Sequence, residues 1–319
     1  MRKWIALLII ALTLVGCVPP STPVAPTEDT HLKMGLLPIL DVIPFFVAEQ
    51  KGYFEEQGIT VELIPVKSAQ ERDTLMQTGQ IDGQLNDLIS TALFNKDRPK
   101  IKVVYIARKA YPDAPQFRIL AAPDTDLRAP ADLKGVPIGI SQNTIIEYIT
   151  QRLLEAEGLA PEEIVFTEVT AIPVRFELLM NGQLQAATLP DPLAQGAIAG
   201  GAHLIIDDSA HTELSLSVLS FSVEALERKP NTVRKFLIAW EKAVKDINAN
   251  PEAYQDLLIE KGRVPKSIQG TYTMPPFPVG EVPTEAQCAD VVQWLKDKGL
   301  IERNIPHEEL VDASFLPGE

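Results

Sequence analysis

Residues 45–87 read FFVAEQKGYFEEQGITVELIPVKSAQERDTLMQTGQIDGQLND, and residues 148–191 read YITQRLLEAEGLAPEEIVFTEVTAIPVRFELLMNGQLQAATLPD. Each stretch has a helix that ends at a glycine, an apolar strand, a second helix that ends in LMxxG or LLMNG, and a further strand that closes on an aspartate. A repeat of this length predicts two similar α/β lobes rather than a solenoid. Two such lobes placed face to face form a cleft, where small molecules usually bind.

The composition limits the classes of partner. The 319 residues allow two separate cores, and a hydrophobic content of 45% is typical of a globular protein. A formal net charge of −14 argues against binding to nucleic acid, or to an anionic membrane surface by electrostatics. We expect no nucleic-acid partner, and we expect a monomer.

The first residues indicate export. Arg2 and Lys3 precede an apolar run that is too short for a comfortable membrane span and that ends just before Cys17. A small residue before this cysteine resembles the lipobox of bacterial lipoproteins. The resemblance implies a signal peptide over residues 1–16, lipid on Cys17, and a Pro-rich tether over residues 17–31. An ordinary signal peptide with a chance cysteine is the alternative. The expected location is the extracytoplasmic face of the cell membrane.

The rest of the chain alternates strands and helices. Repeated βα units imply mostly parallel sheets. The chain leaves the first lobe near Tyr111 and returns near Ser215, so two crossings form a hinge that permits closure. We assign residues 32–115 and 216–319 to lobe one, and residues 116–215 to lobe two.

Two C-terminal segments have distinct patterns. The region 233–248 predicts a helix whose apolar side chains have helical spacing and should face a core: Val233, Phe236, Leu237, Trp240, Val244 and Ile247. The segment 262–283 is Pro-rich and aromatic, with little regular pattern. It is long for a loop without regular structure, which suggests that it lines a cavity.

From about residue 32 to residue 249 the chain resembles a known family. It carries PxxxxxPFFxAxxxGYFxxxGIxVEL, LMxxGxID and LKGxPIGIS…YxxxxLLxxxGL in this order. This order of motifs is similar to that of the substrate-binding proteins of bacterial ABC importers. The relevant branch has the type 2 periplasmic-binding fold and binds sulfonates, taurine, nitrate, thiamine-pyrimidine precursors or riboflavin. The resemblance implies a small-molecule ligand and an ABC permease with its ATPase as partners.

In open α/β sheets, ligands bind beyond the carboxyl ends of the strands. Four strand-to-helix turns should therefore meet at the cleft, at residues 37–44, 86–88, 141–144 and 189–192. The candidate ligand-binding residues lie in these turns or are nearby tyrosines: Asp41, Asn86, Asp87, Tyr111, Ser141, Gln142, Asn143, Thr144, Tyr148, Asp191 and Tyr272.

The same turn residues also suit helix caps. Pro192 fits a first helical position with Asp191 as the cap before it, and Thr144 with Glu147 fits a capping box. Capping alone and ligand contact both remain open for these residues. The two roles are compatible, because a helix N-terminus offers its remaining amides to a ligand.

The charge at the turns predicts the kind of ligand. Each turn has a carboxylate at or beside it and none contains Lys or Arg; the carboxylates are Asp41, Asp87, Glu147 and Asp191. A like-charge contact at about 4 Å costs on the order of 4 kcal/mol at an effective dielectric near 20, which is half of the roughly 8 kcal/mol behind a micromolar affinity. We predict a neutral or weakly basic ligand with several N–H or O–H donors. If Lys67, Arg108 or Arg175 reaches the cleft, its positive charge reverses the sign of the charge that the cleft presents to a ligand.

Aromatic residues favour a flat ligand. We expect Tyr111, Tyr148 and Tyr272 to be exposed to the cleft, where a heterocycle can stack on their rings. Within the family that the chain resembles, a flat and neutral ligand suggests riboflavin first and an aminopyrimidine thiamine precursor second. An aliphatic sulfonate or taurine is a further alternative. A lipid-anchored ligand sensor without a permease is the alternative from another class.

Enzyme functions fit the sequence less well. Residues 139–143 fall one glycine short of a G-x-S-x-G nucleophile elbow, and two duplicated lobes contradict the continuous sheet of a hydrolase. The four histidines show no metal-binding spacing. A pyrimidine synthase of the same architecture would require a Cys-rich iron-binding run, and only Cys288 remains as a free cysteine once Cys17 carries lipid. We expect Cys288 to be a small buried residue, and we expect no cofactor, metal or catalysis.

Overall fold

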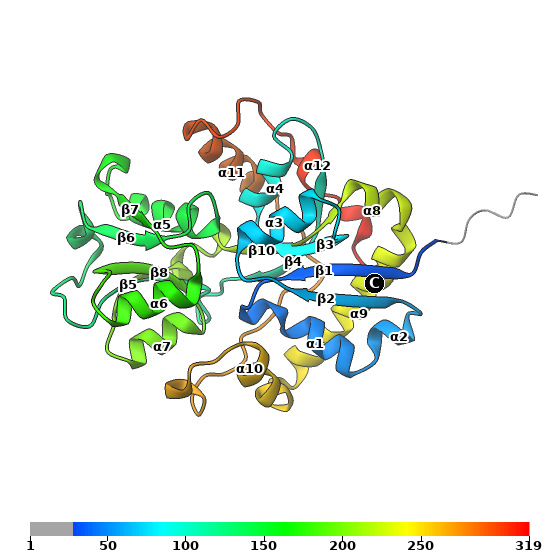
Figure 1. The fold of residues 1–319 in the computed structure, drawn as a ribbon, viewed down its shortest axis with the longest axis horizontal. Coiled ribbons are helices and arrows are strands. Elements are labelled where there is room, and N and C mark those ends of the chain that lie inside the picture. The colour runs from blue at the N-terminus through cyan, green and yellow to red at the C-terminus, as the bar shows by residue number, and fades with distance from the viewer. Residues whose placement is uncertain (1–27, 319) are drawn as a thin grey trace, which may run out of the picture.

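The computed structural model describes residues 28–318, which fold into two α/β lobes (Figure 1). The predicted signal peptide and Cys17 lie outside the described residues, as does most of the tether. One sheet consists of β1 (His31–Leu36), β2 (Thr60–Pro65), β3 (Gly83–Asn86), β4 (Ile101–Lys109) and β10 (Leu216–Ser222). The other consists of β5 (Phe117–Ala121), β6 (Pro137–Ile140), β7 (Val165–Glu168), β8 (Ala186–Pro190) and β9 (His203–Asp207). The predicted α/β fold with two similar lobes is confirmed.

The two sheets have equivalent strand orders, β2-β1-β3-β10-β4 and β7-β6-β8-β5-β9. In each sheet the fourth strand runs antiparallel to its neighbours, and the other strands are parallel. These antiparallel strands, β10 and β5, are the ones that enter a lobe from the other lobe. The sheets are therefore mostly parallel, as predicted, with one antiparallel strand in each.

The helices pack on the two sheets and on one another. Those of the first lobe are α1 (Ile43–Gln50), α2 (Tyr53–Glu56), α3 (Ala69–Gln77), α4 (Leu88–Phe94), α8 (Val223–Arg228), α9 (Pro230–Ala249), α10 (Gln255–Lys261), α11 (Glu285–Asp297) and α12 (His307–Leu310). Those of the second lobe are α5 (Ile145–Ala156), α6 (Ile172–Met180) and α7 (Leu193–Ala199). Among residues 28–318, no helix combines the length and the apolar character that a membrane span needs.

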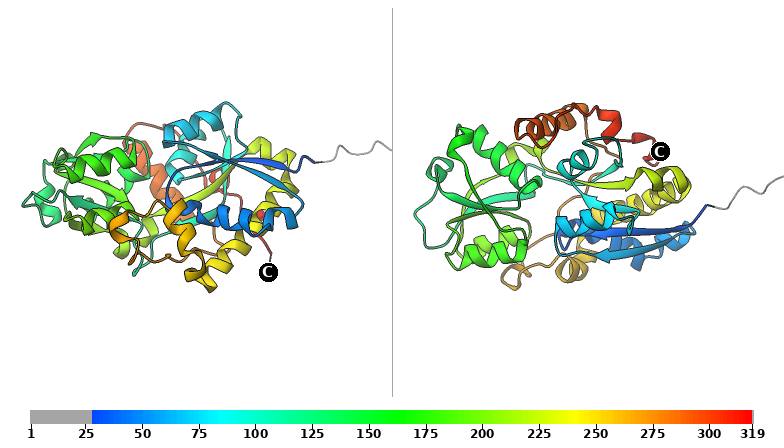
Figure 2. Two further views of the ribbon diagram at one scale, coloured as in Figure 1. Left: turned by 60° about the horizontal axis from the view of Figure 1, so that its bottom comes forward. Right: turned by 45° about the horizontal axis from the view of Figure 1, so that its top comes forward.

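The chain crosses between the lobes twice, after β4 and before β10 (Figure 2, right). The side chain of Gln116, on the first crossing, donates a hydrogen bond to the Ser217 hydroxyl on the second at 2.8 Å. Asp208 is buried and accepts hydrogen bonds from the amides of Gln116 and Phe117 at 2.9 and 3.0 Å. Burial raises the pKa of Asp208 to about 6. Side-chain hydrogen bonds therefore tie the two crossings together.

The repeat extends to a buried arginine in each lobe. Arg72 on α3 donates to the carbonyl of Leu85 on β3 at 3.1 Å, and Arg175 on α6 donates to the carbonyl of Thr188 on β8 at 2.8 Å. A glycine lies beside each arginine, Gly35 on β1 and Gly139 on β6. A Cβ at Gly139 would lie 2.6 Å from Leu184 and 3.5 Å from Arg175, and a Cβ at Gly35 would lie 2.8 Å from Ile81 and 3.5 Å from Arg72. A larger residue at either position would therefore displace the end of the neighbouring aliphatic side chain.

The predicted core positions of the long C-terminal helix are confirmed. In α9 the side chains of Val233, Phe236, Leu237, Trp240, Val244 and Ile247 are all fully buried. Phe236 and Trp240 contact Phe45 of α1, with ring centroids 5.8 and 4.6 Å apart. Cys288 is also buried, as expected, and burial raises its pKa to about 12. This core makes lobe one a rigid support for one wall of the cleft.

Candidate functional site

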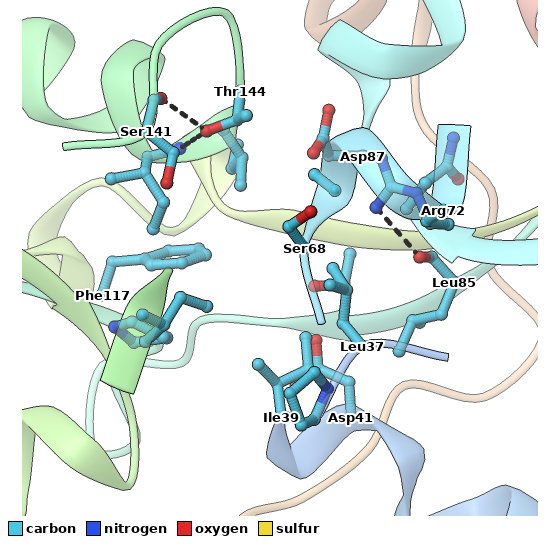
Figure 3. Close-up of a pocket in the computed structure, with 18 of the residues that line it drawn as sticks. Leu37, Ile39, Asp41, Ser68, Arg72, Leu85, Asp87, Phe117, Ser141 and Thr144 are labelled. Carbon is cyan, nitrogen blue, oxygen red and sulfur yellow. Dashed lines mark hydrogen bonds between the residues drawn. The ribbon is translucent and has the colours of Figure 1, made fainter. Parts of the chain in front are cut away.

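A cavity lies between the lobes, at the carboxyl ends of the parallel strands (Figure 3). Its empty space, with the open mouth included, is about 800 Å³. Residues from each of the four predicted strand-to-helix turns line the cavity. The fold therefore brings the four turns together around one site.

Most of the cavity wall is apolar. Lobe one contributes Leu37, Pro38 and Ile39 from the turn after β1, and lobe two contributes Phe117, Ile145, Ile172, Pro173 and Pro190. Phe117 is the first residue of β5, directly after the first crossing, and only 4% of it is exposed. Its ring faces Leu37 and Ile39 across the cavity (Figure 3). Two apolar walls of this kind suit a flat ring held between them.

Three of the four turn carboxylates have a basic partner. Asp41 pairs with Arg108 at 3.1 Å, and each of these two residues is only 1% exposed. The other two pairs are Asp191 with Arg118 and Glu147 with Lys298. Arg108 and Lys67 both line the cavity, and the basic residues lie far from the carboxylates in the sequence. The prediction that the turns repel anions through several free carboxylates is therefore wrong, because most of that charge is neutralised within the protein.

Asp87 differs from the other turn carboxylates. It ends the turn after β3, and its Oδ1 accepts a hydrogen bond from the Ser90 amide at 2.7 Å, which caps α4. Its pKa is raised because burial disfavours the charged form, and the nearby Arg72 guanidinium opposes this shift. Arg72 itself is held by Asp73, with Nε and Nη2 at 2.8 and 2.7 Å from one carboxylate oxygen. Asp87 therefore brings a carboxyl group without an ion-pair partner among residues 28–318 to the cavity wall.

The lobe-two turn is built around Ser141 and Thr144. The Thr144 hydroxyl donates to the Ser141 carbonyl at 2.8 Å and accepts from the Ile146 amide at 3.2 Å, which caps α5. The Ser141 hydroxyl donates to the Thr170 carbonyl at 3.0 Å and accepts from Arg175 at 2.8 Å. Ser141 and Thr144 line the cavity. Arg175 lies behind Ser141, and burial lowers its pKa to about 9.

The capping predictions are met in part. Thr144 caps α5 as expected, but the Glu147 side chain accepts from the Asn143 amide at 2.7 Å rather than from the amide of Thr144. Pro192, rather than Asp191, is the N-cap residue of α7. The Asp191 carboxylate pairs with Arg118 instead of capping the helix because both charged groups are buried, and a buried charge without a partner is costly.

The remaining predicted site residues divide between the cavity and other places. Asn86 lines the cavity, but its amide is already bonded to Thr91 and Ser220 at 3.1 and 2.6 Å. Gln142 and Asn143 are exposed, and they do not line the cavity.

The three tyrosines also occupy different places. Tyr148 is 2% exposed, so the expectation that it faces the cleft is wrong. It packs edge-on against Trp294 of α11 at 5.5 Å and donates to Asp290. Tyr111 lies half-buried at the first crossing, bonded through its backbone to Ala114.

Tyr272 lines a second, more polar chamber beside the first. This chamber has an empty volume of about 660 Å³ and shares Arg108 with the apolar cavity. Its other polar lining residues include Arg118, Asp191 and Gln195. Burial raises the pKa of the Tyr272 hydroxyl, and the neighbouring Asp191 adds to the shift. The Pro-rich segment therefore lines a chamber, and its Pro265 packs on Gly196 of α7 in the opposite lobe.

Sequence reasoning missed several residues of the cavity, above all Phe117, Gln116, Arg118 and Arg72. The repeat contained a signal for Arg72, because Arg72 and Arg175 occupy equivalent positions of the two copies. Phe117 had only a weak signal, as the first apolar residue after the first crossing. Within residues 28–318, no cluster of His, Cys, Asp or Glu could hold a metal ion.

Comparison with known proteins gives a match over most of the chain. Residues 40–254 match the protein family described as NMT1/THI5 like. The riboflavin-binding protein RibY of Chloroflexus aurantiacus is 23% identical over 279 residues, which cover 80% of this chain and 76% of that protein. A formylaminopyrimidine-binding protein of Halalkalibacterium halodurans is 26% identical over 176 residues, covering 52% of this chain and half of the relative.

Solved structures show the same fold at low sequence identity. The alkanesulfonate-binding protein SsuA of Xanthomonas axonopodis superposes with a TM-score of 0.71 over 90% of this chain and 98% of that one, at 17% identity. The fold is therefore common to proteins with quite different ligands. The side chains at the cleft, rather than the fold, must decide which solute binds.

Proposed function

Because the chain belongs to the NMT1/THI5-like family, we propose that it is the solute-binding protein of an ABC importer and captures a neutral, flat heterocycle between its lobes, riboflavin before others. The observation that carries this proposal is the apolar cavity at the lobe interface, with Phe117 on one wall and Leu37 and Ile39 on the other. Aromatic and aliphatic walls favour a flat ring because burial of apolar area and ring contacts both stabilise it.

The polar chamber supports the choice of riboflavin. The adjoining chamber offers Tyr272, Gln195 and the Arg118–Asp191 pair, which are suited to hydroxyl groups. A ligand with a flat ring and a polyhydroxylated chain would place one part in each chamber. Riboflavin has both parts. The similarity to a riboflavin-binding protein over 80% of this chain points in the same direction.

A melting experiment tests the proposal. The purified protein is heated with riboflavin, with a formylaminopyrimidine or with an alkanesulfonate. We expect riboflavin to raise the melting temperature most, since a ligand at about 100 times its Kd stabilises the fold by about 2.7 kcal/mol. Visible flavin absorbance of the purified protein would agree with this result. No shift with riboflavin, together with a clear shift for the alkanesulfonate, would contradict the proposed ligand class.

An aminopyrimidine is the second candidate. Asp87 carries a carboxylate to the cavity wall, and amino groups on a pyrimidine donate hydrogen bonds to such an acceptor. The similarity to a formylaminopyrimidine-binding protein favours this ligand. The same melting experiment decides between the two, because a pyrimidine leaves the polar chamber empty and gains nothing from the residues there.

Delivery and anchoring complete the proposal. The resemblance of Cys17 and its neighbours to a lipobox supports a lipid anchor on the extracytoplasmic face of the membrane. Release to a permease with its ATPase distinguishes a transporter component from a ligand sensor. Uptake of labelled riboflavin by cells that express this protein with a permease and ATPase encoded beside it would support transport. Equal uptake without the protein would contradict it.

A further inference from the structure

Asp87 contacts helix starts in both lobes. Through Ser90 it caps α4 of its own lobe, at 2.7 Å. Its carboxylate also lies near the backbone amide of Ile145, which slightly opposes the rise of the Asp87 pKa caused by burial. Ile145 is the first residue of α5 in the other lobe. Asp87, Thr144 and Ile145 line the same cavity, and Figure 3 shows Asp87 opposite Thr144.

The start of α5 would otherwise attract anions. The N-terminal amides of a helix and its dipole favour negative charge. In this protein its own side chains already accept from two of these amides. The Asn143 amide donates to Glu147 at 2.7 Å, and the Ile146 amide donates to the Thr144 hydroxyl at 3.2 Å. The Ile145 amide lies near the Asp87 carboxylate. The amides of Glu147 and Tyr148 donate to the Thr144 carbonyl.

Asp87 also sets the sign of the local charge. Among residues 28–318, it is the turn carboxylate that has no basic side chain within ion-pair distance. The nearest basic group, Arg72, is bound directly by Asp73. Arg72, Asp73 and Asp87 together carry a net negative charge when all three are ionised. An incoming anion at the start of α5 would therefore meet partly occupied donors and the like charge of Asp87, while the Lys67 ammonium lines the same cavity.

We propose that Asp87 is the specificity-determining residue that excludes anionic solutes, because its carboxylate lies beside the start of α5 in the same cavity when the lobes are together. The inference rests on the proposed function, since it assumes that solutes bind in this cavity. The same fold occurs in an alkanesulfonate-binding protein. In this chain, one side chain would decide whether neutral or anionic solutes bind.

Substitution of Asp87 tests the inference. Asp87→Ser keeps a short cap for α4 and vacates the position at α5, and Asp87→Asn keeps the shape and removes the charge. Methanesulfonate and nitrate are titrated calorimetrically into each variant and into the parent. We expect at least a tenfold gain in anion affinity for Asp87→Ser and a smaller gain for Asp87→Asn.

Glu168→Gln is the matched control. Glu168 ends β7 at the same edge of the lobe-two sheet, is exposed, and does not line the cavity. The control loses the same charge, and we expect no gain in anion affinity. An equal gain for the control, or a folded Asp87→Ser protein that binds neither anion, would overturn the inference. Riboflavin binding by the parent, measured in parallel, reports on the proposed function alone.

The parent protein offers a test that needs no variant. The groups that face Asp87 are Arg72 and Asp73 on α3, the Ser90 amide on α4 and the Ile145 amide on α5. Because the pKa of Asp87 is raised, acid should protonate it and admit anions. We expect methanesulfonate affinity to rise as the pH falls from 7 in the parent, and to rise less in Asp87→Asn. The same affinity at every pH in the parent would contradict the inference, even if neither variant folds.

Discussion

Phe117 is the side chain on which the proposed ring binding depends most. It supplies an aromatic face to the cavity and is held by the hydrogen bond from its amide to Asp208. We expect Phe117→Ala to weaken riboflavin binding by about tenfold or more, since an aromatic contact contributes about 0.5–1.5 kcal/mol beyond the area that it buries. Fluorescence titration of riboflavin measures the change. Phe166→Ala is the control, because Phe166 is half-buried on β7 outside the cavity. Equal weakening in both variants would contradict the role of Phe117.

The Asp41–Arg108 pair contributes to stability as well as to the cavity wall. Both groups are almost completely buried, and their Oδ1 and Nη1 atoms are 3.1 Å apart. Asp41→Asn leaves the arginine charge buried without its partner, which should lower the free energy of unfolding by about 3 kcal/mol. Denaturant unfolding measures this loss. The double variant Asp41→Asn/Arg108→Met should recover most of it, and a double variant as unstable as the single one would contradict this explanation.

Side-chain pairings of this kind are where sequence reasoning failed. The four turn carboxylates were identifiable because each turn follows a strand. Their partners were not, because Arg108 lies 67 positions from Asp41 and Lys298 lies 151 positions from Glu147. Only the folded chain brings such pairs together. Three of the four turn carboxylates are therefore neutralised by a basic partner. Asp87 has no such partner among residues 28–318, so the predicted repulsion of anions depends on this residue.

At the scale of elements, the paired crossings respond to pH. Burial raises the pKa of Asp208 to about 6, above its ordinary value of 3.8. The folded protein therefore binds more protons than the unfolded chain between these two values, so stability should fall as the pH rises from about 4 to about 6. Denaturant unfolding at several pH values measures this slope. Asp208→Asn should flatten it, and an unchanged slope in this variant would assign the effect to other groups.

The elements themselves were largely predictable. Helix periodicity, glycine stops and β-rich runs are local signals, and they located α9 and the duplicated units on either side of the hinge. The order of the strands was harder to predict from the sequence. β10 and β5 insert between strands of the repeat, and this arrangement depends on contacts between lobes that no local pattern records. Tyr148 was misplaced for a similar reason, because its partner Trp294 belongs to a helix far along the chain.

At the scale of the whole molecule, α5 and α11 form a second contact between the lobes. Arg152 binds Asp290 through two nitrogens, at 2.9 and 3.2 Å, and Trp294 donates to Gln151 at 2.9 Å. The start of α5 also lines the cavity. The contact between α5 and α11 therefore stabilises the arrangement of the lobes that surrounds the cavity.

Removing this contact should weaken binding without changing the cavity. We expect Asp290→Ala to lower ligand affinity several-fold, because apparent affinity falls with the population of the competent state. Small-angle scattering should show a larger radius of gyration for the free variant than for the free parent, and equal values at saturating ligand. Asp297→Ala on the same helix is the control, since within residues 28–318 the Asp297 side chain is bonded only to Gln293. A free variant as compact as the parent would contradict this role.

The central claim is that a solute binds between the two lobes, with its ring against Phe117. The most direct test is a crystal structure of the protein grown with riboflavin. We expect density for the ring between Phe117 and Ile39, with the hydroxylated chain directed toward Tyr272. Riboflavin bound anywhere outside this cleft, or a cleft that stays empty at saturating riboflavin, would contradict it.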